Sequence, residues 1–263
     1  MADLRLIGRI FITGEVRAIT GLHIGGSEGL FSIGGVDNTV IVDPITQQPY
    51  IPGSSLRGKM RSLLEKYEGK VTGQTIQDAT IHQCKSQDEY NKCPICNLFG
   101  VPAGGSEKQL KNKPTRLVVR DIRLTDDSVK RLLDARTMLQ YTEVKTEVSI
   151  DRVTSQAVPR QIERVPAGAI FGPMTLIVNV YQEQDVDWVR DLVKAMSLLE
   201  DDYLGGSGSR GSGQVRFEGL KVTLKAGRDY KEMYHSADLA TVETVTNQLE
   251  DILSQIKQHI AQV

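Results

Sequence analysis

Nine residues, 205–213, place five glycines among three serines and one arginine, and this run constrains the fold more than any other stretch of the 263-residue chain. Its composition excludes regular secondary structure, yet an amphipathic helix pattern ends where it begins and an alternating strand pattern follows it. Glycine also lets backbone N–H groups approach another molecule closely, because no Cβ atom intervenes. We therefore predict a loop that holds phosphate groups, and the alternative is a flexible Gly/Ser tether between domains.

This glycine loop differs from the P-loop of nucleotide triphosphatases. No Lys-Ser or Lys-Thr pair follows its last glycine, and a helix precedes it instead of a strand. A longer polyanion such as RNA fits better. Because the formal net charge is -1, we expect any nucleic-acid site to be a local patch on a balanced surface. The candidate contacts in the loop are Gly206, Ser207, Gly208, Ser209, Arg210 and Gly211.

Hydrophobic periodicity predicts an α+β fold with a ferredoxin-like order of elements in a single domain, residues 1–235. The patterns place strands at 9–18, 117–123, 174–181 and 214–224, and helices at 52–67 and 189–199. The RNA-recognition motif has the same architecture, but its aromatic platform is missing here, so RNA is expected on loops and helix ends. Insertions are expected at 19–53 (with short strands at 40–42 and 50–51), 68–115 and 126–169 (a short helix, then a projecting hairpin at 141–166). A C-terminal amphipathic helix, from about 238 to 260 within the extension 236–263, is expected to pack on its own domain or on a neighbouring copy.

Two further segments carry clustered cations. The helix at 52–67 is expected to be capped by a serine and to offer bare N–H groups to an anion, and the alternative is a solvated basic face. The hairpin is expected to hold phosphates and to wedge Val158-Pro159 between bases, and the alternative is a plain surface hairpin. The candidate RNA contacts are Ser54, Ser55, Arg57, Lys59 and Arg61 on the helix, and Arg152, Arg160 and Arg164 on the hairpin.

All three cysteines lie in the 68–115 insertion, as Cys84, Cys93 and Cys96, close to His82. This spacing supplies four ligands for a tetrahedral zinc ion, whose role would be to fold a polar insertion. A redox dithiol is the alternative, but no thioredoxin-like βαβ pattern accompanies the cysteines. The basic residues that follow, up to Arg116, are expected to lie in a solvated loop.

No apolar run reaches the ~18 residues that a membrane span requires, and the first residues lack a signal-peptide core. Three cysteines, an odd number, favour metal binding or free thiols over disulfides. We therefore expect a cytoplasmic protein with no membrane partner.

Several motifs occur together in one order, over roughly residues 7–225. They include Thr20-Gly-Leu-His-Ile-Gly-Gly, Tyr50-Ile-Pro-Gly-Ser-Ser-Leu-Arg-Gly-Lys-Met-Arg and the glycine loop. Together they resemble the repeated backbone subunit of type III-A CRISPR (Csm) effector complexes, in the RAMP superfamily. The resemblance implies that copies stack into a helical filament along the CRISPR RNA, beside other Csm subunits. It also implies that the hairpin is a thumb that flips one nucleotide in each repeat of pairing with complementary target ssRNA.

By this resemblance Asp37 matches an aspartate that the family needs for divalent-metal-dependent cleavage of target RNA. A Mg²⁺ or other divalent ion on Asp37 would neutralise developing charge, and proton transfer is the less favoured role for one carboxylate. His23 is expected either to orient the scissile region or donate a proton, or to be a structural loop residue. Two other functions stay open: a non-catalytic crRNA-binding scaffold, and a stand-alone RAMP endonuclease that cuts precursor RNA without added metal.

Overall fold

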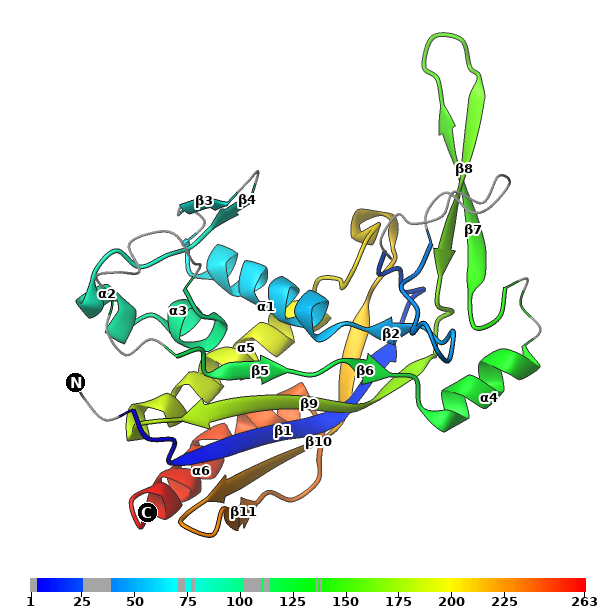
Figure 1. Cartoon of the computed structure of the whole chain (residues 1–263). Coiled ribbons are helices and arrows are strands. Elements are labelled where there is room, and N and C mark those ends of the chain that lie inside the picture. Colours follow the sequence, from blue (N-terminus) through cyan, green and yellow to red (C-terminus); the bar gives the residue numbers. More distant parts are fainter. Residues whose placement is uncertain are drawn as a thin grey trace.

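The computed structural model describes residues 4–25, 39–70, 74–76, 79–101, 110, 114–135, 137 and 139–263. Its centre is an antiparallel sheet in which one long strand, β1, lies between two others of similar length (Figure 1). The sheet consists of β11 (Lys231–His235), β10 (Val215–Ala226), β1 (Gly8–Ala18), β9 (Ile170–Val180) and β5 (Leu117–Val119) in that spatial order, with β12 (Leu239–Thr241) also paired to β10. The predicted strands at 9–18, 174–181 and 214–224 are confirmed as β1, β9 and β10.

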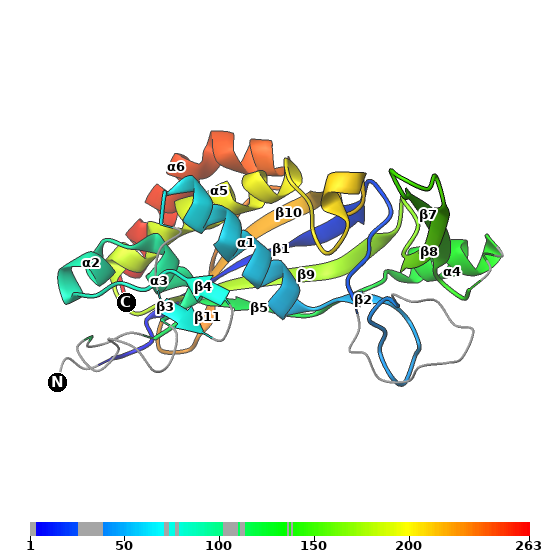
Figure 2. The same ribbon diagram turned by 90° about the horizontal axis from the view of Figure 1, so that it is seen from above.

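Helices α1 (Gly53–Tyr67), α5 (Trp188–Glu200) and α6 (Val242–Ile260) lie together on one side of this sheet (Figure 2). Ile10, Ile12, Val16 and Ala18 on β1 are buried, and partly or fully exposed residues lie between them. Gly14, at a shift in strand register, is the one position of this alternation that is only partly buried. That period of two is what a strand with one covered face requires. The α+β class and the predicted succession of strands and helices are confirmed, and we interpret the sheet order as ferredoxin-like.

The predicted second core strand is divided in two. β5 joins the main sheet through β9, whereas β6 (Ile122–Arg123) pairs with β2 (Tyr50–Ile51) in a separate ladder. The strand predicted at 40–42 is reduced to isolated bridges, Gly25 with Val40 and Val42 with Pro49. Proline has no N–H to donate, so a regular ladder does not extend past Pro49.

The C-terminal helix packs on its own domain. α6 contacts α5, β10, β11 and β12, and the predicted helix start is wrong because residues 239–241 form β12. Ile252, Leu253 and Ile256 are buried in the common hydrophobic core. Arg190 on α5 binds both carboxylate oxygens of Glu250 on α6 at 2.7 Å, which reinforces this contact. Within the described residues, no helix combines the length and apolar character needed to cross a membrane.

A buried helix, α3 (Pro94–Phe99), and a buried arginine that follows the insertion, Arg116, tie residues 68–115 to the core. This insertion contains β3 (Gln74–Ile76), β4 (Ala79–Ile81), α2 (Gln87–Asn91) and α3, and every residue of α3 is buried. The expectation that Arg116 is solvated is wrong, because it is 3% exposed. Its guanidinium lies 3.1 Å from the Asp185 carboxylate and donates to the Tyr90 hydroxyl at 2.6 Å. A buried cation requires such a partner, and Asp185 in η2 (Glu183–Val186) supplies it.

The predicted hairpin is confirmed as β7 (Glu143–Ile150) and β8 (Ala157–Arg164), which extend away from the body (Figure 1). The helix before it is α4 (Asp126–Asp134). Most side chains in the outer half of the hairpin are exposed, including Val148 and Val158 at 54% and 56%. We call this hairpin the thumb.

Replacing Ile256 with alanine is expected to lower the free energy of unfolding by about 2–5 kcal/mol, because it opens a cavity between α6 and the sheet. Gln255→Ala, an exposed neighbour on the same helix, is the control and is expected to change it by less than about 0.5 kcal/mol. Urea unfolding followed by circular dichroism measures both. Equal stability of the two variants would show that α6 does not belong to the core.

Candidate nucleic-acid interface and metal cluster

Three segments that are far apart in sequence meet at one end of the sheet. β1 ends there, and residues 20–25 continue from it between the glycine loop and the base of β8. Gly206 N–H donates to the His23 carbonyl at 2.8 Å, and Gly213 N–H donates to the Gly21 carbonyl at 3.0 Å. Leu22 and Val165 exchange backbone hydrogen bonds on the other side. The glycine loop is therefore docked on the body and is not a tether.

The loop conformation depends on glycine where it contacts residues 20–25. Gly205 has φ +81°, and a Cβ atom there would collide with the His23 carbonyl oxygen. The short helix η3 (Gly208–Arg210) forms the tip, and Ser209, Arg210 and Gly211 are exposed. The N–H groups of five loop residues already donate hydrogen bonds within the protein. Those residues are Gly206, Arg210, Gly211, Ser212 and Gly213. Fewer loop N–H groups are therefore left to bind a phosphate than the glycine content indicates.

A carboxylate on the thumb gathers three cations beside the loop. Glu147 lies 2.9 Å from the Arg210 guanidinium, 3.7 Å from that of Arg160 and 3.4 Å from the Lys145 ammonium. Arg210 also donates to Ser207 Oγ at 2.9 Å. The predicted candidates Arg160 and Arg210 are thus brought together, with each side chain about half exposed. Glu147 was not predicted, because its role depends on the register that places it opposite Arg160.

The start of α1 differs from the prediction. The N-cap is Pro52 and makes no side-chain cap, so the expected serine cap is wrong. Gly53 N–H donates to Asp121 Oδ1 at 2.7 Å, which satisfies one of the N–H groups expected to be bare. Ser54 is exposed and Ser55 is partly buried. The helix start therefore offers less to an anion than the sequence indicates.

The α1 cations are engaged inside the protein. Arg61 donates to Glu65 and to carbonyls of His82, Phe99 and Gly100, and its side chain is 13% exposed. Arg57 donates to the Phe99 carbonyl. These contacts favour a structural role for both arginines, which join α1 to the insertion.

Lys59 connects α1 to the glycine loop. Its ammonium lies 2.8 Å from Asp202 and 3.6 Å from the centre of the Tyr203 ring. The same ring lies directly beside Gly208, where a Cβ atom would overlap it. Lys59 therefore supports the loop from below, and Tyr203 is a supporting residue that hydrophobic periodicity alone did not reveal.

The two remaining thumb arginines lie at opposite ends of the hairpin. Arg152 is exposed in the turn between β7 and β8. Arg164, at the base, binds Glu143 at 2.6 Å and lies over Gly21. Only Arg152 and Arg160 of the three thumb candidates are therefore open to a long polyanion.

His23 lies where the loop, β8 and residues 20–25 meet. Its Nδ1 is 2.6 Å from the Glu163 carbonyl oxygen, and its ring faces Gly206. The other predicted catalytic residue, Asp37, lies outside the described residues. Gly25 and Val40, which precede and follow that segment, are bridged to each other beside His23.

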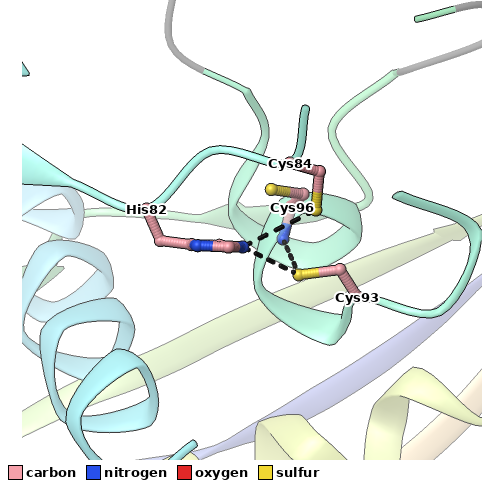
Figure 3. A group of neighbouring side chains, drawn as sticks. All are labelled: His82, Cys84, Cys93 and Cys96. Atoms are coloured by element: carbon pink, nitrogen blue, oxygen red, sulfur yellow. Dashed lines mark hydrogen bonds between the residues drawn. The ribbon is translucent and has the colours of Figure 1, made fainter. Parts of the chain in front are cut away.

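The predicted metal ligands form one cluster in the insertion (Figure 3). The ligand atoms of His82, Cys84, Cys93 and Cys96 all lie within 4.8 Å of one another. His82 Nε2 is 3.6 Å from Cys84 Sγ and 3.3 Å from Cys93 Sγ. A tetrahedral zinc ion with Zn–N and Zn–S distances of about 2.0–2.3 Å separates its ligands by about 3.3–3.8 Å, so the arrangement fits a metal such as zinc.

The environment of the cluster favours a thiolate. Hydrogen bonds from Cys84 and Cys96 hold the pKa of the Cys93 thiol below its ordinary value, and His82 adds to this effect. A thiolate is the form that binds metal. All three cysteines are free of disulfides and buried.

Comparison with known proteins identifies the family. The RAMP superfamily model matches residues 15–216. The chain belongs to the RAMP superfamily. Two archaeal relatives are named "CRISPR system Cms endoribonuclease Csm3". The relative from Methanothermobacter thermautotrophicus is 41% identical over 87% of this chain and 91% of its own length. The relative from Methanocaldococcus jannaschii is 36% identical over 97% of both.

Solved RAMP structures support this assignment. A chain of the Csm3–Csm4 subcomplex of the type III-A CRISPR-Cas interference complex is 28% identical, with a TM-score of 0.60 over 95% of this chain and 98% of that one. Csm3 from Methanopyrus kandleri, 20% identical with a TM-score of 0.61 over 95% of this chain and 98% of that one, has the same fold.

Two glycine substitutions separate backbone strain from close packing in this RAMP loop. Gly205→Ala is expected to lower the free energy of unfolding by about 2–4 kcal/mol, because a left-handed alanine is strained and its Cβ displaces the His23 carbonyl. Gly211→Ala is the matched control, with φ +83° and open space around it. It carries the strain alone, about 1 kcal/mol. Equal losses in urea unfolding would show that the loop is not held against residues 20–25.

Proposed function

We propose that this chain is a repeated backbone subunit of a type III-A CRISPR effector complex, that it binds the CRISPR RNA, and that it cleaves complementary target RNA. Its relatives are named as endoribonucleases, and the match to this chain covers nearly their whole length. The observation that carries the proposal is the meeting of the glycine loop, His23 and the base of the thumb at one end of the sheet. That meeting combines phosphate-binding cations with a group able to contact the scissile region.

The exposed groups indicate how the RNA is held. Arg210 at the loop tip and Arg160 on the thumb are each about half exposed beside one another. Cations so placed contact phosphates without reading bases, as a subunit repeated along one guide RNA requires. Arg152, further out on the thumb, extends this surface, and Ser54 and Ser55 at the start of α1 add hydroxyl donors. The exposed Val158 on the thumb is the candidate wedge between bases.

Target cleavage is assigned to Asp37, with His23, from the same 19–53 insertion of the sequence, as the second candidate. In-line attack on a phosphate requires a backbone geometry that a flipped nucleotide makes accessible. A divalent cation such as Mg²⁺ on Asp37 would stabilise the charge that develops on the phosphate. His23 orients the scissile region or transfers a proton.

Other copies of this chain and other Csm subunits are the proposed partners. One structural relative lies in a Csm3–Csm4 subcomplex. Another, with 17% identity to this chain and a TM-score of 0.53, belongs to a Cmr-beta complex bound to cognate target RNA. A helical filament presents the same loop and thumb at regular intervals, so cleavage would be periodic.

Zinc is the proposed occupant of the His82, Cys84, Cys93 and Cys96 cluster. Four protein ligands leave no open position, which is typical of a structural site. Cys93 and Cys96 bracket the first turn of α3, whose side chains enter the main core. The metal would therefore hold α3 in place. The carbonyls at the end of this helix accept hydrogen bonds from Arg57 and Arg61 on α1.

Asp37→Ala in the assembled complex is expected to retain guide and target binding and to abolish periodic cleavage, because it removes the metal-binding carboxylate. The control is Asp229→Ala, at an exposed position in the turn between β10 and β11. Sequencing-gel analysis of end-labelled target RNA measures the cuts, and gel shift measures binding. Unchanged cleavage in Asp37→Ala would leave only a scaffold role for this chain. Cleavage of isolated precursor RNA in EDTA would instead identify a stand-alone processing enzyme.

Wild-type chain is expected to hold about one zinc ion, and His82→Ala is expected to lose most of it and to melt at a lower temperature. His235→Ala, which changes an exposed histidine on β11, should keep the zinc. Plasma emission spectrometry after dialysis measures the metal. A wild-type chain without zinc, with Cys93 and Cys96 freely alkylated in the native state, would contradict the site.

A further inference from the structure

One residue at the base of the thumb, Glu163, holds three separate segments around His23. Its carbonyl oxygen is 2.6 Å from His23 Nδ1. One oxygen of its carboxylate accepts from Val40 N–H at 2.9 Å, and the other accepts from the Thr142 hydroxyl at 2.6 Å. Glu163 thus connects three segments: His23 lies after β1, Val40 lies in the chain that leads to β2, and Thr142 lies just before β7.

The carbonyl contact fixes the proton position on His23. A carbonyl oxygen only accepts hydrogen bonds, so the proton must lie on Nδ1. Nε2 of the neutral ring is then the atom with a free electron pair. A free imidazole side chain in water prefers the opposite tautomer, so this state depends on the position of the Glu163 carbonyl.

The other edge of the ring faces two positions without side chains. An ideal Cβ atom on Gly25 would be 3.7 Å from His23 Nε2, and one on Gly206 would be 3.9 Å from it. Glycines at both positions keep side chains away from the atom that is left as an acceptor. The ring is therefore held at Nδ1, and at these two positions of the described chain no side chain stands against Nε2.

We propose that Glu163 is a positioning residue for target cleavage: it sets His23 as the Nδ1–H tautomer with Nε2 directed at RNA, and it anchors Val40 beside it. This rests on the proposed function, because it assigns His23 to the cleavage site. Glu163 acts through hydrogen bonds and not through charge. Its carboxylate contacts an amide N–H and a hydroxyl and forms no ion pair among the described residues.

Glutamine tests this distinction. In Glu163→Gln the amide oxygen still accepts from Val40 N–H, and the amide NH₂ donates to the Thr142 hydroxyl, which accepts equally well. Cleavage by complexes with Glu163→Gln is expected to stay within about threefold of wild type. Glu163→Ala loses both bonds, and kcat is expected to fall by about tenfold or more while target KM changes by less than about twofold. Glu232→Ala, at an exposed position on β11, is the matched control and should cleave normally.

A spectroscopic measurement tests the tautomer independently of activity. In ¹⁵N-labelled wild-type chain, long-range ¹H–¹⁵N correlation at neutral pH is expected to show His23 as Nδ1–H. Thr142→Val, which removes one hydrogen bond to Glu163, should raise the Nε2–H fraction.

An Nε2–H ring in the wild type would overturn the proposal even if Glu163→Ala fails to fold. So would normal kcat in Glu163→Ala, or a tenfold loss in Glu163→Gln. An intact tautomer effect together with a wild-type complex that does not cut RNA would instead contradict the proposed function.

Discussion

The antiparallel pairing of β1 with both β9 and β10 is the constraint on which the functional region depends. Antiparallel neighbours begin where a strand ends, so the residues after β1 must meet those before β9 and before β10. Those residues are 19–25, the base of the thumb and the glycine loop. Nothing in the loop's own composition selects this meeting. It follows from hydrophobic side chains that alternate along three strands and bury one face of the sheet.

Several charged side chains hold separate segments of this protein together. Arg116 with Asp185, and Arg61 with Glu65 and three carbonyls, join the metal-binding insertion to the body. Both guanidiniums are buried or nearly so, and a buried cation without partners would destabilise the fold. Arg210 and Arg160 remain about half exposed beside each other, and Arg152 is exposed further out on the thumb, so the candidate RNA contacts form a local patch. That explains how a chain of net charge -1 can present an RNA-binding surface.

Two glutamates link the thumb to the rest of the region in different ways. Glu147 uses its charge and collects Arg210, Arg160 and Lys145, so it connects the thumb to the glycine loop. Glu163 uses hydrogen bonds and connects the thumb base to His23 and Val40. These two glutamates thus connect the thumb with the groups proposed to bind and cut the RNA backbone.

The sequence by itself determined most of the core elements and the four residues of the His/Cys cluster. Periods of two and 3.6 predicted β1, β9, β10, α1, α5 and the thumb within a few residues, and the four metal ligands followed from their spacing. These features depend on local geometry, which neighbouring residues encode. The tertiary structure decided which charged residues are free: Arg116, Arg61 and Arg57 look like surface cations in sequence, yet their partners lie far along the chain. It also revealed the supporting roles of Glu147, Glu163 and Tyr203. The contacts of these side chains depend on long-range pairing and strand register, which no local sequence pattern encodes.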